Sequence, residues 1–183
     1  MALKATIYKA HLQLADMDRG VYTDQNLTLA RHPSETDERM MIRLLAFALN
    51  MPADNDQGAL EFGKGLWDPE EPELWRRDLT GQIIHWIEIG QPDERRLMKA
   101  SGRAGRVTVI SYSQSTPIWW SGIANKITRA RNIEAWQIGT AQSQALAELA
   151  QRSMQLQISV QDGIAYIGDG QRDVEIGPSR LNA

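Results

Sequence analysis

Two carboxylates and a lysine stand near one predicted strand and together could support metal-dependent chemistry. Glu88 lies within the apolar run Ile83–Ile89, and Glu73 precedes this run while Lys99 follows it. A carboxylate among apolar neighbours loses solvation unless a cation, a metal ion or hydrogen-bond donors compensate. Carboxylate oxygens are ligands that Mg²⁺ and Mn²⁺ prefer, and such an ion polarises phosphoryl groups and activates water. The residues therefore indicate chemistry on a phosphate ester, and a structural ion pair is the alternative.

Other common catalytic centres lack the residues that they need. The chain has no cysteine, which excludes thiol chemistry, and its three histidines have neither metal-ligand spacing nor an obvious nucleophile partner. No Gly-rich phosphate loop follows a predicted strand. Carboxylate and lysine chemistry remain.

A predicted hairpin brings the two carboxylates together. The segment 78–81 has Asp first and Gly fourth, as in a type I turn, so the residues on either side form two antiparallel arms. If the arms pair about Leu79 and Thr80, Glu73 lies opposite Trp86 and about 5 to 8 Å from Glu88 on the usual cross-strand spacing. Asp78 would lie roughly 33 Å from Glu88 along the strand, which makes it a turn residue.

A basic helix is predicted directly after the strand. Gly90, Gln91 and Pro92 break the strand, and a helix runs from Asp93 to Gly102. The segment 95–106 holds five basic residues and no acidic one, namely Arg95, Arg96, Lys99, Arg103 and Arg106. This density predicts either a phosphate-binding surface or a solvated helix face.

The remaining segments predict an α/β fold with a mixed sheet. Alternating polarity predicts strands over 8–14 and near Leu27 and Leu29, paired antiparallel, and a further antiparallel sheet at the end of the chain. The order strand, helix, strand over 82–112 favours a parallel crossover. A helix capped by Ser34 carries Glu38 near its buried stripe, where the acid serves either a site or the helix dipole.

Length and composition predict one cytoplasmic domain. The 183 residues are 42% hydrophobic and 23% charged, and no apolar run approaches the roughly 20 residues that span a membrane. The first residues lack a signal-peptide pattern, and the absence of cysteine gives no sign of disulfides. The net charge of −3 opposes bulk attraction to nucleic acid or anionic lipid, although a local basic patch can still bind phosphate.

The chain resembles the YaeQ family over essentially its whole length. The segments that carry the resemblance are IYKAHLQLADMDRGVY, LTLARHPSETDERMMIRLLAFAL, EPELW, HWIEIGQPDERRLMKA, the WW pair and LQISVQDG. This resemblance implies a variant of the PD-(D/E)xK restriction-endonuclease-like core. In that core a helix, a three-stranded antiparallel element, a crossover helix and a fourth strand frame a divalent-metal site. Residues 1–183 would then form a single nuclease-like domain with extra N-terminal and C-terminal antiparallel strands.

The resemblance assigns roles to individual residues. Glu73 is similar to the acid of the PD element, and Glu88 is similar to the acid of (D/E)xK. Gly90 stands where that motif has lysine, so Lys99 on the following helix resembles a relocated equivalent. Gln91 is a further polar member of the implied site. Glu38 resembles the helix acid of many such nucleases.

These roles imply a metal-dependent nuclease or phosphodiesterase acting on nucleic acid. Glu73, Glu88 and Glu38 would hold Mg²⁺ or Mn²⁺, and Lys99 would stabilise the attacking hydroxide or the developing charge. The guanidinium groups expected to meet phosphate are those of Arg95, Arg96 and Arg103. One alternative is a non-catalytic module on a degenerate nuclease fold that binds nucleic acid or a protein. The other is a structural ion-pair network of Glu73, Glu88 and Arg96.

Overall fold

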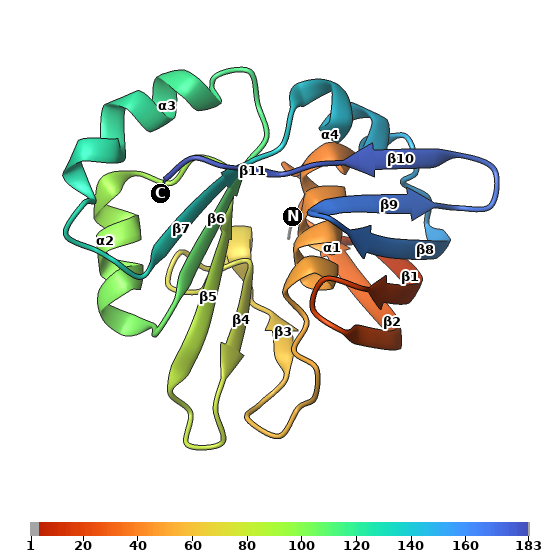
Figure 1. Ribbon diagram of the computed structural model, residues 1–183, viewed down its shortest axis with the longest axis horizontal. Coiled ribbons are helices and arrows are strands. Elements are labelled where there is room, and N and C mark those ends of the chain that lie inside the picture. Colours follow the sequence, from red (N-terminus) through yellow and green to blue (C-terminus); the bar gives the residue numbers. More distant parts are fainter. Residues whose placement is uncertain (1–3, 183) are drawn as a thin grey trace. The chain divides into compact units, whose positions relative to one another are not determined.

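The computed structural model describes residues 4–182 and shows a mixed α+β fold with two mixed sheets and four α-helices (Figure 1). The described chain forms two compact units. The first contains the described residues up to Ala53 together with Ala141–Gly177, and the second contains Asp54–Thr140 with the described residues from Pro178 on. The α+β class with mixed sheets is confirmed. The single domain over residues 1–183 stays a prediction.

The sheet of the first unit combines local and distant pairings. Its strand order is β10-β9-β8-β1-β2. The strands are β1 Thr6–Asp16, β2 Val21–Arg31, β8 Ser153–Gln161, β9 Ile164–Gly168 and β10 Asp173–Ile176. The predicted antiparallel pairing of β1 with β2 is confirmed, as is the antiparallel sheet of β8, β9 and β10. Sequence alternation did not predict that β1 also pairs with β8 in parallel, with His11 beside Gln155.

Helix α1, Asp37–Asn50, begins two residues later than a Ser34 cap would place it. The side chain of Thr36 caps the helix, because it accepts a hydrogen bond of 3.1 Å from the backbone N–H of Arg39. The Ser34 hydroxyl instead lies 2.7 Å from Nδ1 of His32. The predicted Ser34 cap is therefore wrong, since a local contact with His32 occupies that hydroxyl. The second helix that reaches into this unit is α4, Thr140–Ala147.

A buried ion pair lies at the start of α1. Glu35 and Arg43 are 4% and 6% exposed, and Arg43 donates from Nε and Nη2 to the two carboxylate oxygens at 2.9 and 2.7 Å. Arg39 adds a third donor, with Nη1 2.6 Å from Oε2. These charge-assisted bonds offset the desolvation of the carboxylate and tie the turn before α1 to the helix.

The second unit is built on a sheet with the order β11-β7-β6-β5-β4-β3. Its elements are β3 Leu60–Phe62, the short 3-10 helix η1 Gly65–Trp67, β4 Leu74–Arg77, β5 Ile83–Ile89, α2 Glu94–Arg103, β6 Val107–Ser111, α3 Thr116–Ile123, the 3-10 helix η2 Ala124–Lys126, β7 Ile133–Gln137 and β11 Ser179–Arg180. Strands β5, β6 and β7 are parallel, whereas β3, β4 and β5 are antiparallel. The predicted parallel crossover through α2 is confirmed.

Helix α2 packs an apolar face on the sheet and leaves a basic face outside the core. Asp93 caps the helix by accepting from the Arg96 N–H at 2.8 Å. Leu97 and Ala100 are buried in one cluster with Trp86 of β5 and the aliphatic side chains of β6 and β7. The same strand face that carries Trp86 also carries Glu88 two residues later, because side chains alternate along a strand. The packing of α2 therefore brings Arg96 to Glu88.

A buried histidine lies on the other face of this sheet. His85 is 7% exposed, and its Nε2 lies 2.8 Å from the hydroxyl of Thr108. Burial lowers the pKa of His85 from 6.5 to about 4, and the charges of Arg106 and Arg76 contribute to the decrease. The folded protein therefore holds this imidazole neutral at pH values where an exposed histidine takes up a proton.

Acidification is expected to destabilise the folded state through His85. Above pH 6.5 neither state protonates the ring, so its contribution to stability is fully present there; between pH 6.5 and about 4 only the unfolded state takes up the proton. The free energy of unfolding should therefore fall by about 3 kcal/mol near pH 4, at 1.36 kcal/mol per pKa unit.

Chemical denaturation of wild type and His85→Gln across this pH range measures this decrease in the free energy of unfolding. The variant should show a flatter pH profile, and His11→Gln, the control, should keep the wild-type slope. A profile of His85→Gln as steep as that of wild type would contradict this assignment.

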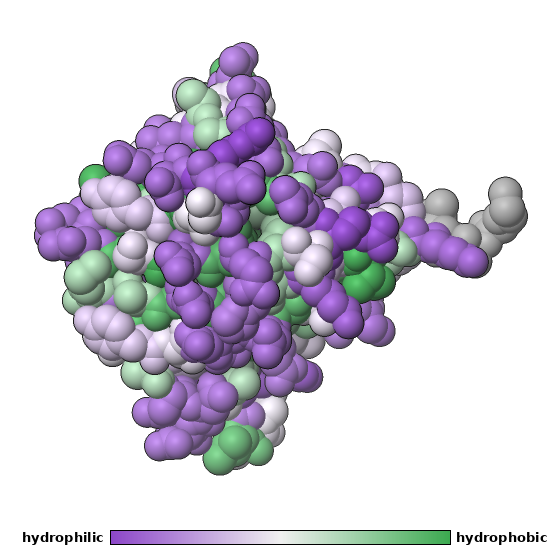
Figure 2. All heavy atoms as spheres, turned by 90° about the vertical axis from the view of Figure 1, so that its right-hand side faces the viewer, coloured by the Kyte–Doolittle hydropathy of each residue, from purple (hydrophilic) through white to green (hydrophobic). Residues whose placement is uncertain are grey.

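No helix in the described part of the chain is long and apolar enough to cross a membrane. Several large apolar side chains are nevertheless exposed, among them Leu79 at 82% and Ile118 at 77%. On the face drawn in Figure 2, hydrophobic areas are interrupted by hydrophilic side chains. Scattered exposed apolar residues of this kind are ordinary on protein surfaces.

Candidate carboxylate site

Glu88 is a buried acid held by two donors. Its side chain is 5% exposed, and Oε1 accepts hydrogen bonds from the Trp86 indole at 2.7 Å and from Nε of Arg96 at 2.8 Å. Burial raises the pKa of Glu88, against the opposing effects of the Arg96 charge and the two hydrogen bonds. Glu88 is thus an acid whose protonation state depends on its immediate neighbours.

Glu73 lies near Glu88 at the start of β4. Leu74 pairs with Ile87, and the Glu73 N–H donates to the carbonyl of the same Ile87 at 3.2 Å, so Glu73 lies just before the regular pairing of β4 with β5. Glu73 is 5% exposed, and its charge contributes to the raised pKa of Glu88. Two buried carboxylates therefore lie near each other at one end of the β4–β5 ladder.

The predicted register of this hairpin is wrong by two residues. Trp75, rather than Glu73, lies opposite Trp86. The Asp78 N–H bonds to the carbonyl of Gln82, so the turn is centred on Thr80, and a bulge between Arg76 and Arg77 adds the second residue of the shift. A shift of two residues keeps each side chain of the paired segment on its original face. The charge of Glu73 still acts on Glu88, as the predicted proximity requires.

The space beside Glu73 requires a glycine. A Cβ built on Gly65 would lie 2.4 Å from Oε2 of Glu73, and Gly65 has a φ of +53°. A residue with a Cβ at this position would have to displace the Glu73 carboxylate and would adopt a backbone conformation that is unfavourable for residues other than glycine. Sequence reasoning missed Gly65 because no local pattern links it to Glu73. The Trp86 donor was also missed, although its spacing of two residues from Glu88 on a strand was a usable signal.

Arg96 ties Glu88 to the loop before β4. Besides its bond to Glu88, it donates from Nη1 to the Pro69 carbonyl at 2.6 Å and from Nη2 to the Glu71 carbonyl at 3.1 Å. The ion pair between Glu88 and Arg96 that the sequence offered as an alternative is thus present. The phosphate-binding role of Arg96 stays a prediction.

Lys99 lies against the same loop, with Glu70 as its partner. Its Nζ is 2.9 and 3.1 Å from the two carboxylate oxygens of Glu70, and these side chains are 55% and 65% exposed. The hydrogen bond and charge of Lys99 lower the pKa of Glu70. Arg103 donates to the Glu70 carbonyl at 3.3 Å, and its guanidinium lies 5.1 Å from the centre of the Trp86 ring. The structure therefore brings Lys99 to Glu70, next to the buried carboxylates but paired outside them.

Gln91 and Arg95 lie outside the contacts that hold the buried carboxylates. Gln91 is at the end of β5 and donates from Nε2 to the hydroxyls of Ser113 and Ser115 at 2.6 and 2.8 Å. Arg95 is exposed on α2. Gln91 thus belongs to a polar group at the carboxyl ends of β5 and β6, and Arg95 is open to solvent.

Glu38 belongs to the other compact unit. Its Oε2 accepts a hydrogen bond of 2.8 Å from the buried hydroxyl of Ser143, which joins α1 to α4. Within residues 4–182, no three acidic or histidine side chains are grouped as metal ligands. The role of Glu38 as a third ligand is a prediction that the geometry of the second unit leaves open.

Comparisons with known proteins place the chain in a family. The family model described as YaeQ protein matches residues 1–178. Proteins named "Uncharacterized protein YaeQ" from Salmonella typhi and Escherichia coli are 45% and 44% identical over 177 residues, which cover 96% of this chain and 95% of each relative. The crystal structure of YaeQ from Xanthomonas axonopodis pv. citri is 46% identical, with a TM-score of 0.91 and coverage of 98% of this chain and 99% of that one. The Pseudomonas syringae YaeQ structure is 36% identical, with a TM-score of 0.90 and coverage of 98% and 97%.

Proposed function

We propose that this chain, which belongs to the YaeQ family, is a divalent-metal-dependent nuclease or phosphodiesterase acting on nucleic acid. The observation that carries the proposal is the pair of buried carboxylates, Glu73 and Glu88, which lie near enough for the charge of Glu73 to raise the pKa of Glu88. Burying two acids together costs free energy unless cations or hydrogen-bond donors compensate, and Arg96 and the Trp86 indole offset part of that cost at Glu88. A bound divalent ion would remove that cost.

The order of elements in the second unit supports a PD-(D/E)xK core. Strands β3, β4 and β5 form a three-stranded antiparallel element, α2 crosses over, and β6 follows parallel to β5. This is the order that the family resemblance implies after the first helix. In this proposal Glu73 and Glu88 take the acidic positions of that core.

The two carboxylates fit the coordination that Mg²⁺ uses. Mg²⁺ commonly keeps several waters and is held by one or two carboxylates together with substrate phosphate, so a third acid is not required. When bound, the ion would polarise the phosphoryl group and activate water. Oε1 of Glu88 is engaged by Trp86 and Arg96. Those two donors fix the orientation of the Glu88 carboxylate.

The basic face of α2 supplies the groups for phosphate. The ion pair of Lys99 with Glu70 is exposed, so solvent and salt screen it and it stabilises the protein little. A substrate phosphate can therefore replace Glu70 at little cost and bring Lys99 to the developing charge. Arg95, Arg96 and Arg103 lie on the same helix and would position the nucleic-acid backbone. Gln91 is a further polar contact in this proposal, and Glu38 remains the candidate third ligand.

A cleavage assay tests the function directly. Purified protein is incubated with labelled single-stranded and double-stranded DNA and RNA in Mn²⁺, in Mg²⁺ or in EDTA. We expect cleavage of at least one substrate that depends on the metal ion and stops in EDTA. Cleavage that persists in EDTA, or no cleavage of any substrate under any condition, would contradict the proposal.

A second function is favoured by the ion pairs already present at the site. Arg96 forms an ion pair with Glu88, and Lys99 forms one with Glu70. This arrangement also suits a non-catalytic module that binds nucleic acid or a protein on a nuclease-like scaffold. Calorimetric titration separates the two functions. The enzyme should bind Mn²⁺ and lose that binding in Glu73→Gln, whereas the binding module should bind nucleic acid in a salt-sensitive manner without metal.

A further inference from the structure

Three arginines lie on one face of the sheet in the second unit, opposite the face that packs on α2. Arg76 pairs with His85 across β4 and β5, and Arg106 precedes β6 at the position beside His85. Arg180 of β11 pairs with Trp136 of β7. We call Arg76, Arg106 and Arg180 the arginine row. Its members come from β4, the start of β6 and β11, so neighbours are two strands, about 10 Å, apart in the hydrogen-bonding direction. Arg180 is also displaced along the strands by four residues, roughly 13 Å, because it lies beside Trp136 whereas Arg106 lies beside Asn132.

Each guanidinium of the arginine row is anchored through its Nε atom. Arg76 donates from Nε to the Gly58 carbonyl at 2.8 Å, and Arg180 donates from Nε to Oδ1 of Asn182 at 2.7 Å. Arg106 donates from Nε and Nη2 to the Glu134 carboxylate at 3.2 and 2.8 Å. These bonds hold the three forks in place and leave Nη1 of every arginine outside the anchoring contacts. Ordering the side chains in advance lowers the entropy cost of binding a ligand.

The charge of this face is positive. Glu134 is the acid within the row, and although burial alone would raise its pKa, Arg106 and Arg180 hold that pKa below its ordinary value. Three guanidiniums against one carboxylate leave two positive charges, because the neighbouring His85 is neutral. A guanidinium fork with free terminal donors matches the oxygens of a phosphate.

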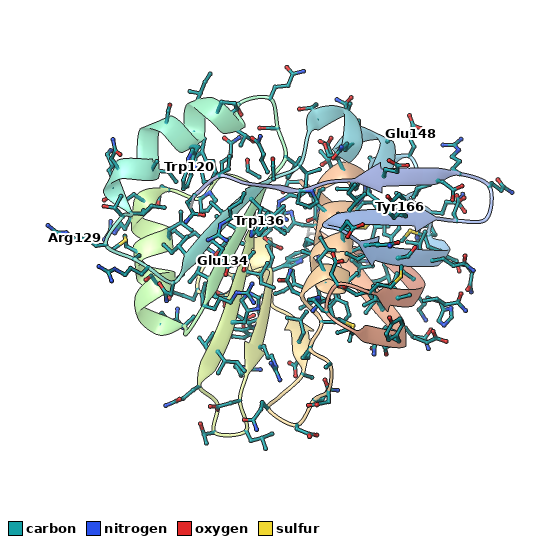
Figure 3. The ribbon with its side chains drawn as sticks, viewed as in Figure 1. Trp120, Arg129, Glu134, Trp136, Glu148 and Tyr166 are labelled. Atoms are coloured by element: carbon teal, nitrogen blue, oxygen red, sulfur yellow. The ribbon has the colours of Figure 1, made fainter. Side chains whose placement is uncertain are left out.

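An aromatic platform adjoins the row. The guanidinium of Arg180 lies over the Trp136 ring, 5.5 Å from its centre, and Figure 3 shows Trp136 and Glu134 along β7. Unpaired bases stack on aromatic rings and on guanidinium planes, whereas paired bases in a duplex are already stacked. An acidic peptide would use the charges but would leave this platform without a partner.

We propose that the arginine row binds single-stranded nucleic acid, with backbone phosphates on Arg106 and Arg180 and a base stacked at Trp136. The identity of the polymer rests on the proposed function, whereas the phosphate chemistry rests on the row itself. The surface is separate from the basic face of α2, since the two lie on opposite faces of the sheet. It would hold a part of the nucleic-acid strand that lies outside the carboxylate site.

Fluorescence anisotropy tests this binding. Labelled single-stranded oligonucleotides of DNA and RNA are titrated in EDTA over a series of salt concentrations, so that no metal-dependent step contributes. The double variant Arg106→Gln/Arg180→Gln should bind about tenfold or more weakly, and the slope of log K against log salt should fall by about 1.4, near 0.7 per lost phosphate contact. Arg172→Gln is the matched control, because Arg172 is an exposed arginine of the first unit with a contact of 3.5 Å to Glu148.

A variant with the opposite expected effect guards against loss of folding. Glu134→Gln removes the one acid of the row and should tighten binding about threefold to tenfold, since no carboxylate then offsets the positive charge of Arg106. Equal affinities of wild type and the double variant, no binding by wild type, or equal competition by polyglutamate would each overturn the proposal. If cleavage needs Glu88 while the double variant binds normally, this proposal fails and the nuclease stands. Binding that needs the row without any cleavage gives the reverse result.

Discussion

Replacement of Glu88 by glutamine is expected to lower the rate of metal-dependent phosphodiester cleavage by about 10²- to 10³-fold. Glutamine keeps the shape of the side chain and can still accept from the Trp86 indole and Arg96 at its oxygen. It removes the charge that would be shared with a divalent ion near Glu73. The loss should therefore appear in kcat/KM at saturating metal, measured on whichever substrate wild type cleaves.

The control for this experiment is Glu175→Gln. Glu175 is an exposed acid on β10 in the first unit, so the same chemical change there should leave the rate within about twofold of wild type. Thermal unfolding of both variants checks that each is folded at the assay temperature. A Glu88→Gln protein that is folded and retains wild-type kcat/KM would show that the carboxylate pair does not carry the reaction.

Replacement of Glu35 by alanine is expected to lower the free energy of unfolding by about 3 to 5 kcal/mol. The change leaves Arg43, which is 6% exposed, without the carboxylate that accepts two of its hydrogen bonds. An uncompensated buried charge costs far more than the lost bonds alone. Urea denaturation followed by tryptophan fluorescence or circular dichroism measures the loss.

Two comparisons separate burial of the charge from its position near α1. Asp37→Ala removes an acid that also pairs with an arginine, Arg31, but its side chain is 46% exposed, so the loss should stay below about 1 kcal/mol. The double variant Glu35→Leu/Arg43→Leu removes both buried charges and should recover most of the stability lost in Glu35→Ala. If Glu35→Ala costs no more than Asp37→Ala, the buried pair does not stabilise the fold.

Local patterns predicted the elements well where burial alternates within one segment. The alternation over residues 8–14 predicted β1, and the break at Gly90 with the basic segment after it predicted α2. The hairpin register could not be predicted, because the turn is centred on Thr80 and the bulge between Arg76 and Arg77 adds a further residue without a sequence mark. The pairing of β1 with β8 could not be predicted either, since alternation shows that a strand has a buried face and not which strand lies beside it.

The candidate site was predicted in part for the same reason. Glu88 stood out because its carboxylate interrupts an apolar strand, and its placement near Glu73 follows from the hairpin. The partners of the basic residues depend on the path of the loop before β4, which brings Glu70 to Lys99 and two carbonyls to Arg96. Spacing along α2 orders these side chains around the helix, but it does not show which of them reaches Glu88.

The parallel contact between β1 and β8 also bears on the order in which the chain folds. His11 lies beside Gln155, a separation of 144 residues. The entropy cost of closing so long a loop must be met before the contacts of β8 with β1 can stabilise the sheet. The second unit has no such requirement for most of its contacts, because Asp54–Thr140 contains nearly all of it in one stretch. During synthesis the edge of β1 that later pairs with β8 therefore stays unpaired until Ser153–Gln161 has left the ribosome, in addition to the outer edge of β2. For that interval the open edge of β1 can pair with a strand of another chain, which is a route to aggregation.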